Sequence, residues 1–149
     1  MNDQGKSFAA MNEHGADLGN FYPVGHIVAA FPTREAAITV QKGLQGKGYT
    51  EEETRYFPPE SVAEGTQRGL DSAGLLSMLG SSLRMVQLYH DLAEKGRHFL
   101  LIHAPDDRDD ERVMSVVREQ PHDLAQKYHR LTIESLDGEL KIPRDIQPG

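Results

Sequence analysis

One short sequence pattern occurs twice in the chain, and this repeat constrains the fold more than any other feature. The two copies read GHIVAAFPTREAAITVQKGL and RHFLLIHAPDDRDDERVMSVV. In each copy a histidine opens an apolar run of strand length, a proline ends that run, and acidic residues begin a segment with helical spacing. The repeat therefore predicts two strand-and-helix units. A length of 149 residues favours placing both units in one domain.

A further strand is expected after each of the two repeated units. We expect these strands over residues 54–57 and 128–133, and one long helix over residues 73–95 after a stretch of spaced glycines. The order strand, helix, strand, repeated once, is that of the ferredoxin-like split βαβ fold. The prediction is an α+β domain with a four-stranded antiparallel sheet, a helical insertion over residues 60–96 between the halves, and residues 54–57 and 128–133 as edge strands.

The ends of the chain lack the periodicity of a packed element. Residues 1–22 show neither strand nor helix spacing and predict a mobile N-terminal arm, without the apolar core of a signal peptide. Residues 137–149 begin with an Asp-Gly turn signal and hold two prolines, which predicts an extended tail. The folded domain is expected over residues 23–136.

Both faces of the two central strands are apolar. Alternation puts Ile27 and Leu100 on one face, and Val28 and Leu101 on the other. The two repeat helices can cover only one face. The second must be covered either by the inserted helix or by another subunit, so we expect a homodimer or larger oligomer.

Composition excludes several classes of function. A formal charge of −7 repels phosphate backbones and anionic lipids, so neither nucleic acid nor a membrane is an expected partner. The absence of cysteine excludes disulfides, thiol nucleophiles, zinc ribbons and Fe–S clusters. No apolar run reaches the length of a membrane span. These features favour a cytoplasmic protein.

Motifs of metal and phosphate chemistry are absent or incomplete. The acidic residues 106–111 lack the EF-hand spacing and are better explained as the stabilised N-terminus of a helix. The seven histidines include no HExxH zinc motif. Gly69 and Gly74 have the spacing of a phosphate-binding loop, but Leu75 stands where lysine is required. There is no serine nucleophile elbow and no RNA-binding aromatic motif. We therefore expect no metal and no cofactor.

Residues 24–57, VGHIVAAFPTREAAITVQKGLQGKGYTEEETRYF, resemble the opening of the heat-induced general stress protein family of YflT type. The segments GRHFLLIHAPDDRDDERVMSVVRE and KYHRLTIESL resemble the second half seen in some proteobacterial relatives. The resemblance covers residues 24–136, mainly at core and turn positions. It implies a small cytoplasmic α/β domain linked to stress responses and supplies no catalytic residue.

These observations favour a non-enzymatic, oligomeric stress-related domain that binds a protein partner or a small ligand. The expected ligand-binding residues, placed on or beside the sheet face away from the repeat helices, are His26, Tyr56, His103, Tyr128 and Arg130. The alternative is a small dimeric ferredoxin-like enzyme, of isomerase or cofactor-free oxygenase type, with a histidine as general base. A third interpretation, a nucleotide sensor, has no phosphate-binding element to support it.

Overall fold

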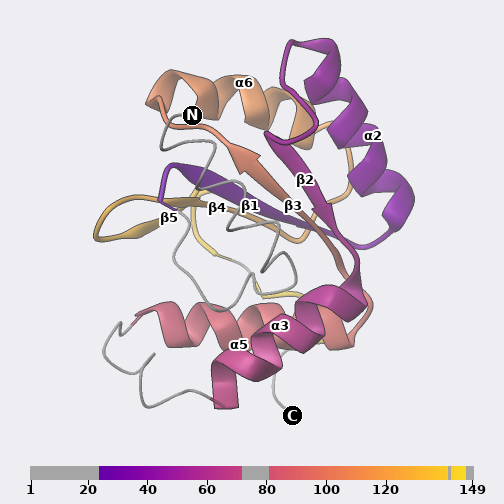
Figure 1. Cartoon of the computed structure of the whole chain (residues 1–149), viewed down its shortest axis with the longest axis vertical. Coiled ribbons are helices and arrows are strands. Elements are labelled where there is room, and N and C mark those ends of the chain that lie inside the picture. Colours follow the sequence, from indigo (N-terminus) through magenta and orange to yellow (C-terminus); the bar gives the residue numbers. More distant parts are fainter. Residues whose placement is uncertain (1–23, 72–80, 141, 147–149) are drawn as a thin grey trace.

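A five-stranded antiparallel sheet forms the middle layer of the structure (Figure 1), a computed structural model that describes residues 24–71, 81–140 and 142–146. In chain order the elements are β1 (His26–Phe31), α2 (Arg34–Gly46), β2 (Thr54–Phe57), α3 (Pro59–Asp71), α5 (Ser81–Glu94), β3 (His98–His103), α6 (Asp107–Val117), β4 (Leu124–Tyr128) and β5 (Ile133–Ser135). The α+β prediction is confirmed.

The strand order is β2-β3-β1-β4-β5. Strand β3 lies between β1 and β2, and β1 lies between β3 and β4, with every neighbouring pair antiparallel. The two halves thus contribute interleaved βαβ units, and the repeated apolar strands occupy the centre as expected. The expectation of four strands is wrong, because β5 pairs with the outer side of β4.

The predicted position of the last strand, residues 128–133, is also wrong. The chain enters the sheet earlier, at Leu124, leaves it after Tyr128, and returns after a turn as β5. All five residues of β4 are buried, including Gln126 and Lys127, whose polarity hides the strand in the sequence. Strand β4 is therefore an inner strand and β5 is the edge, whereas β2 is an edge strand as predicted.

Local signals set the helix that follows each central strand. The Thr33 hydroxyl accepts a hydrogen bond from the Ala36 N–H at 3.1 Å, and the Asp106 carboxylate accepts one from the Arg108 N–H at 2.9 Å. Helix α2 ends at Gly46, and Gly48 then adopts a φ of +104°, which favours glycine. Capping thus explains the acidic segment that begins α6.

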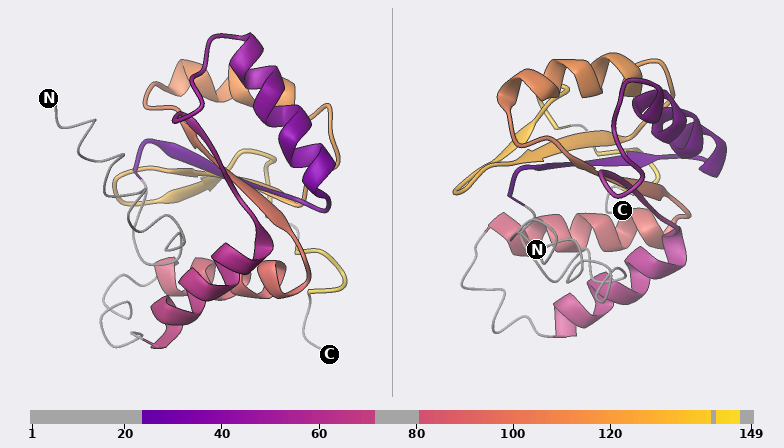
Figure 2. Two further views of the ribbon diagram at one scale, coloured as in Figure 1. Left: turned by 45° about the vertical axis from the view of Figure 1, so that its right-hand side comes forward. Right: turned by 45° about the horizontal axis from the view of Figure 1, so that its top comes forward.

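Helices cover both faces of the sheet (Figure 2). Helices α2 and α6 lie on one side, and α3 and α5 lie on the other. The alternation predicted for the central strands is confirmed, because Ile27 and Leu100 belong to the first core whereas Val28 and Leu101 belong to the second. The second face is therefore covered by the chain's own insertion, which removes the reason for requiring another subunit there.

The insertion differs from the single helix expected over residues 73–95. Helix α5 occupies the later part of that range, residues 72–80 lie outside the described residues, and a separate helix, α3, occupies the glycine-spaced stretch. Buried Thr66 on α3 donates to the Val62 carbonyl at 2.6 Å and contacts His90 Nδ1 on α5 at 3.0 Å. Packing against α5 supports a helix that its glycines disfavour.

The predicted N-terminal arm lies outside the described residues. Within residues 137–146, Leu140 and Ile146 pack against the second core, and Arg97 donates two hydrogen bonds to Asp145, at 2.7 and 2.9 Å. The domain boundaries remain predictions. Among the helices described, none is both long and apolar enough to cross a membrane.

Candidate functional site

Two of the five predicted ligand-binding residues, His26 and His103, are in contact. His26 pairs with His103 across β1 and β3, and their ring centroids are 4.9 Å apart. Tyr128 belongs to the core beneath the same face, where its hydroxyl lies 2.7 Å from that of Tyr89. The buried Tyr128 hydroxyl is thus used in core packing.

The other two predicted residues lie elsewhere. Tyr56 packs against the core under α2 and α6, and its hydroxyl is 2.7 Å from His98 Nδ1. Burial raises the pKa of Tyr56 and lowers that of His98. Arg130 is exposed in the turn between β4 and β5. The structure therefore does not assemble the five residues into one site.

Most of the described histidines have an assigned structural contact. His129 Nε2 lies 2.8 Å from Glu134, His122 Nε2 lies 2.9 Å from Asp137, and His26 Nδ1 lies 3.1 Å from the Val24 carbonyl. Within the ranges that the structure describes, no three histidine or acidic side chains are grouped as metal ligands. These contacts stabilise turns and strand ends.

A cavity of about 240 Å³ opens at one end of the sheet, between α6 and the loop that joins α2 to β2. We call it the α6 pocket. Three segments line it: the α2–β2 loop, the end of β3 together with Pro105, and one side of α6. The lining residues are Lys47, Gly48, Tyr49, Glu53, His103, Pro105, Asp109 and Arg112.

Glu53 and His103 form one side of the α6 pocket. The Thr50 N–H donates to Glu53 Oε1 at 2.9 Å, and the Glu53 N–H donates to the Thr50 hydroxyl at 3.1 Å. Glu53 Oε2 lies 3.6 Å from His103 Nδ1. The Thr50 N–H and the imidazole hold the pKa of Glu53 below its ordinary value, although burial opposes them. Glu53 is therefore ionised at neutral pH.

Tyr49 and Arg112 form the other side of the α6 pocket. The Tyr49 hydroxyl oxygen is buried and makes no hydrogen bond of good geometry among the described residues, although the Arg112 guanidinium lies near enough to interact with it. Burial raises the pKa of this hydroxyl, Asp109 raises it further, and Arg112 opposes the rise. A buried hydroxyl without a well-formed hydrogen bond is uncommon in folded proteins, because its desolvation is poorly compensated. Tyr49 is thus positioned to donate to a ligand.

Of the residues that line the α6 pocket, only His103 was anticipated. Tyr49 and Glu53 stand beside Thr50, and the T-x-x-E spacing at residues 50–53 signals the reciprocal turn that places Glu53. Asp109 and Arg112 have the i, i+3 spacing that puts two side chains on one side of a helix. No local signal shows that these segments meet, because sheet topology brings them together.

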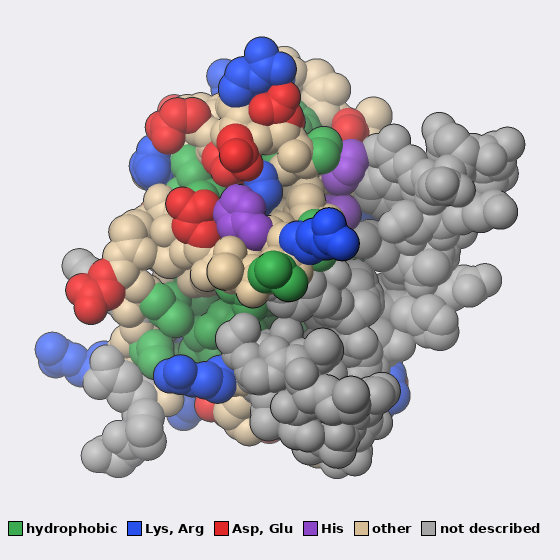
Figure 3. Space-filling model, turned by 90° about the vertical axis from the view of Figure 1, so that its left-hand side faces the viewer, with side chains coloured by type: hydrophobic (Ala, Val, Ile, Leu, Met, Phe, Trp, Pro, Cys, Tyr) green, Lys and Arg blue, Asp and Glu red, His purple; other side chains and the backbone are tan. Residues whose placement is uncertain are grey.

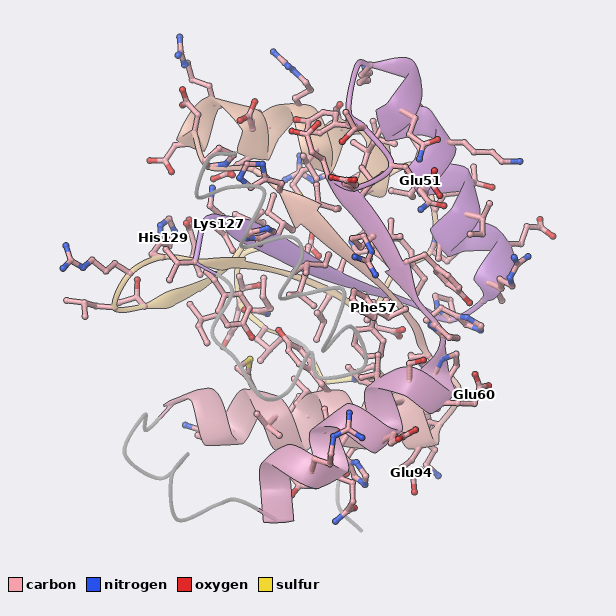
Figure 4. All side chains as sticks on the ribbon, viewed as in Figure 1. Glu51, Phe57, Glu60, Glu94, Lys127 and His129 are labelled. Atoms are coloured by element: carbon pink, nitrogen blue, oxygen red, sulfur yellow. The ribbon has the colours of Figure 1, made fainter. Side chains whose placement is uncertain are left out.

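A lysine beneath α6 holds this helix over the sheet. Figure 4 shows Lys127 on β4, beneath the N-terminal half of α6. The Lys127 side chain is 2% exposed and donates to Asp110 at 2.6 Å, with Asp107 at 3.8 Å. This buried ion pair anchors α6, the helix that carries Asp109 and Arg112 into the α6 pocket.

Charges of both signs are mixed on the described surface around α6. Figure 3 shows acidic and basic side chains interspersed over the upper half of this side of the molecule, with histidines between them. Arg108 pairs with Asp106 at 2.8 Å and Arg118 with Glu111 at 3.2 Å, so these cations are balanced locally. The exclusion of nucleic acid as a partner is untested by this one face and stays a prediction.

Comparison of the chain with protein-family models, with curated proteins and with solved structures gives no match.

Proposed function

We propose that the chain is a small-ligand-binding domain of the ferredoxin-like class, and that its ligand occupies the α6 pocket. The observation that carries the proposal is the convergence in one cavity of a carboxylate-paired histidine, His103, and the buried Tyr49 hydroxyl, which makes no hydrogen bond of good geometry among the described residues. Ligand sites combine concavity with a few placed polar groups. The strand order β2-β3-β1-β4 supports the ferredoxin-like class.

The cellular setting comes from the family resemblance and from composition. A role in a stress response and a cytoplasmic location remain predictions on that basis. Self-association also remains a prediction. It would use surfaces other than the two sheet faces, because the chain's own helices cover both.

A second candidate function is supported by the contact between Glu53 and His103. A carboxylate beside an imidazole orients the ring, and an imidazole has the basicity of a general base near neutral pH. In this case the domain is a small enzyme with His103 as general base. A rate that depends on the protonation of a single histidine, and that disappears in His103→Gln, would favour this function over binding alone.

The binding proposal is tested by thermal shift and calorimetry with a panel of common metabolites, nucleotides and divalent metals. We expect at least one small metabolite to raise the unfolding temperature. His103→Gln should lose this stabilisation while keeping the far-UV circular dichroism of the wild type. His129→Gln, which removes a paired histidine on the β4–β5 turn, is the matched control. Equal ligand responses in the two variants, or no response to the whole panel, would refute the proposal.

A further inference from the structure

The two carboxylates of the α6 pocket differ in how far the chain itself engages them. Glu53 accepts from the Thr50 N–H through Oε1 and faces His103 through Oε2. Asp109 lies 3.9 Å from Arg112 Nη1. Both oxygens of Glu53 thus face groups of the chain itself, whereas Asp109 makes only a long ion pair and keeps acceptor capacity.

The donors of the α6 pocket are less committed. Lys47 makes no ion pair within the part of the chain that the structure describes. The separation between Arg112 and Asp109 is too long for a hydrogen bond, so the guanidinium retains donors for a ligand. The buried Tyr49 hydroxyl adds a third donor. An excess of available donors over available acceptors suits an anion.

Charge and size narrow the class of anion. Two cations, Lys47 and Arg112, face two carboxylates, Glu53 and Asp109, so the α6 pocket is close to neutral when His103 is neutral. Nearby carboxylates repel a dianion about twice as strongly as a monoanion, and the chain as a whole carries a formal charge of −7. A cavity of about 240 Å³ is also smaller than the roughly 300–1,000 Å³ of drug-sized ligand sites.

We propose that the α6 pocket binds a small monocarboxylate, of the size of acetate, lactate or a short 2-oxo acid. The carboxylate lies between the Arg112 guanidinium and the Tyr49 hydroxyl, because the planar guanidinium matches the two oxygens of a carboxylate. This assignment builds on the proposed function, since it names the class of ligand for the same site.

The test is titration of the full chain with acetate, lactate, pyruvate and inorganic phosphate, followed by nuclear magnetic resonance. We expect saturable shifts of the Gly48 backbone amide and of the Arg112 Nε–H with the monocarboxylates, and weaker binding of phosphate. Arg112→Gln and Tyr49→Phe should each weaken carboxylate binding about tenfold, because each removes a donor to a charged group. Arg84→Gln, which removes one exposed positive charge on α5, should leave binding within about twofold.

The outcomes separate the ligand class from the site. Tighter binding of phosphate than of any monocarboxylate, or equal losses in Arg112→Gln and Arg84→Gln, would overturn the monocarboxylate assignment. The proposed function survives that result if another compound of the metabolite panel still shifts Gly48 and depends on His103. If no compound shifts Gly48 or stabilises the chain, both proposals fail.

Discussion

Single polar residues decide where segments of this chain begin and how they pack. Asp106 begins α6 by accepting the Arg108 N–H, and Lys127 holds the same helix to β4 through Asp110. Both residues are charged, as surface residues usually are, but the exposed fractions of their side chains differ. The Lys127 side chain is 2% exposed, whereas the Asp106 side chain is 48% exposed. Asp106 is predictable from its position before a helix, and the burial of Lys127 is not.

Asp106 should make the stability of the fold depend on acid. Hydrogen bonds from the Arg108 side chain and backbone lower the pKa of Asp106 to about 2, below the roughly 3.9 of an unfolded aspartate. A lowered pKa stabilises the folded state above the unfolded value, and this stabilisation is lost as the pH falls from about 4 to about 2. Asp106→Asn keeps the capping acceptor but removes the charge, so its free energy of unfolding should approach that of the wild type across this window.

Urea unfolding at a series of pH values measures this difference. Glu119→Gln removes an exposed carboxylate that has no ion pair among the described residues, and it serves as the control. A constant gap between Asp106→Asn and the wild type from neutral to acid pH would show that the Asp106 charge does not stabilise α6.

At the scale of elements, each helix depends on its neighbour as well as on its own propensity. Helices α2 and α6 approach closely at Gly43, where a Cβ atom would lie 2.9 Å from Val116 Cγ1. Gly46, three residues later on α2, has open space around it. The first glycine is required by packing, and the second only ends the helix.

We therefore expect opposite effects of alanine at these two positions. Gly46→Ala should be neutral or stabilise the fold by up to about 1 kcal/mol through helix propensity. Gly43→Ala gains the same propensity but presses on the stiff, buried Val116, and overpacking costs about 1–3 kcal/mol, so the net effect should be a loss of about 1 kcal/mol. Chemical denaturation of both variants measures the difference.

The Val116→Ala background tests the cause. In that background Gly43→Ala should no longer destabilise the fold, because the obstructing methyl group is gone. Equal losses in the two backgrounds would show that contact with Val116 is not the reason.

At the scale of the whole molecule, the sheet is enclosed between two helical layers of the same chain (Figure 2). The face that carries Val28 and Leu101 meets α3 and α5, where Leu92 is fully buried. Burial of this face is thus part of folding and not of association.

This enclosure predicts that the monomer folds without a partner, so that self-association through other surfaces contributes little to the free energy of unfolding. A subunit interface over the sheet would raise the urea midpoint as the concentration increases, through mass action. We expect the midpoint to stay constant over about a hundredfold range of protein concentration. A midpoint that rises with concentration would show instead that association contributes to the stability of the fold.

Local patterns in the sequence determined the central strands, the starts of the helices that follow them and the two faces of the sheet. Pro32, Thr33 and Pro105 act on the backbone within a few residues, and alternation along a strand is a property of the strand itself. The tertiary structure alone decided the identity of β4, the formation of α3 and the assembly of the α6 pocket. Lys127 becomes acceptable in a strand only when Asp110 meets it, and Tyr49, His103 and Arg112 become neighbours only when the sheet and α6 have packed.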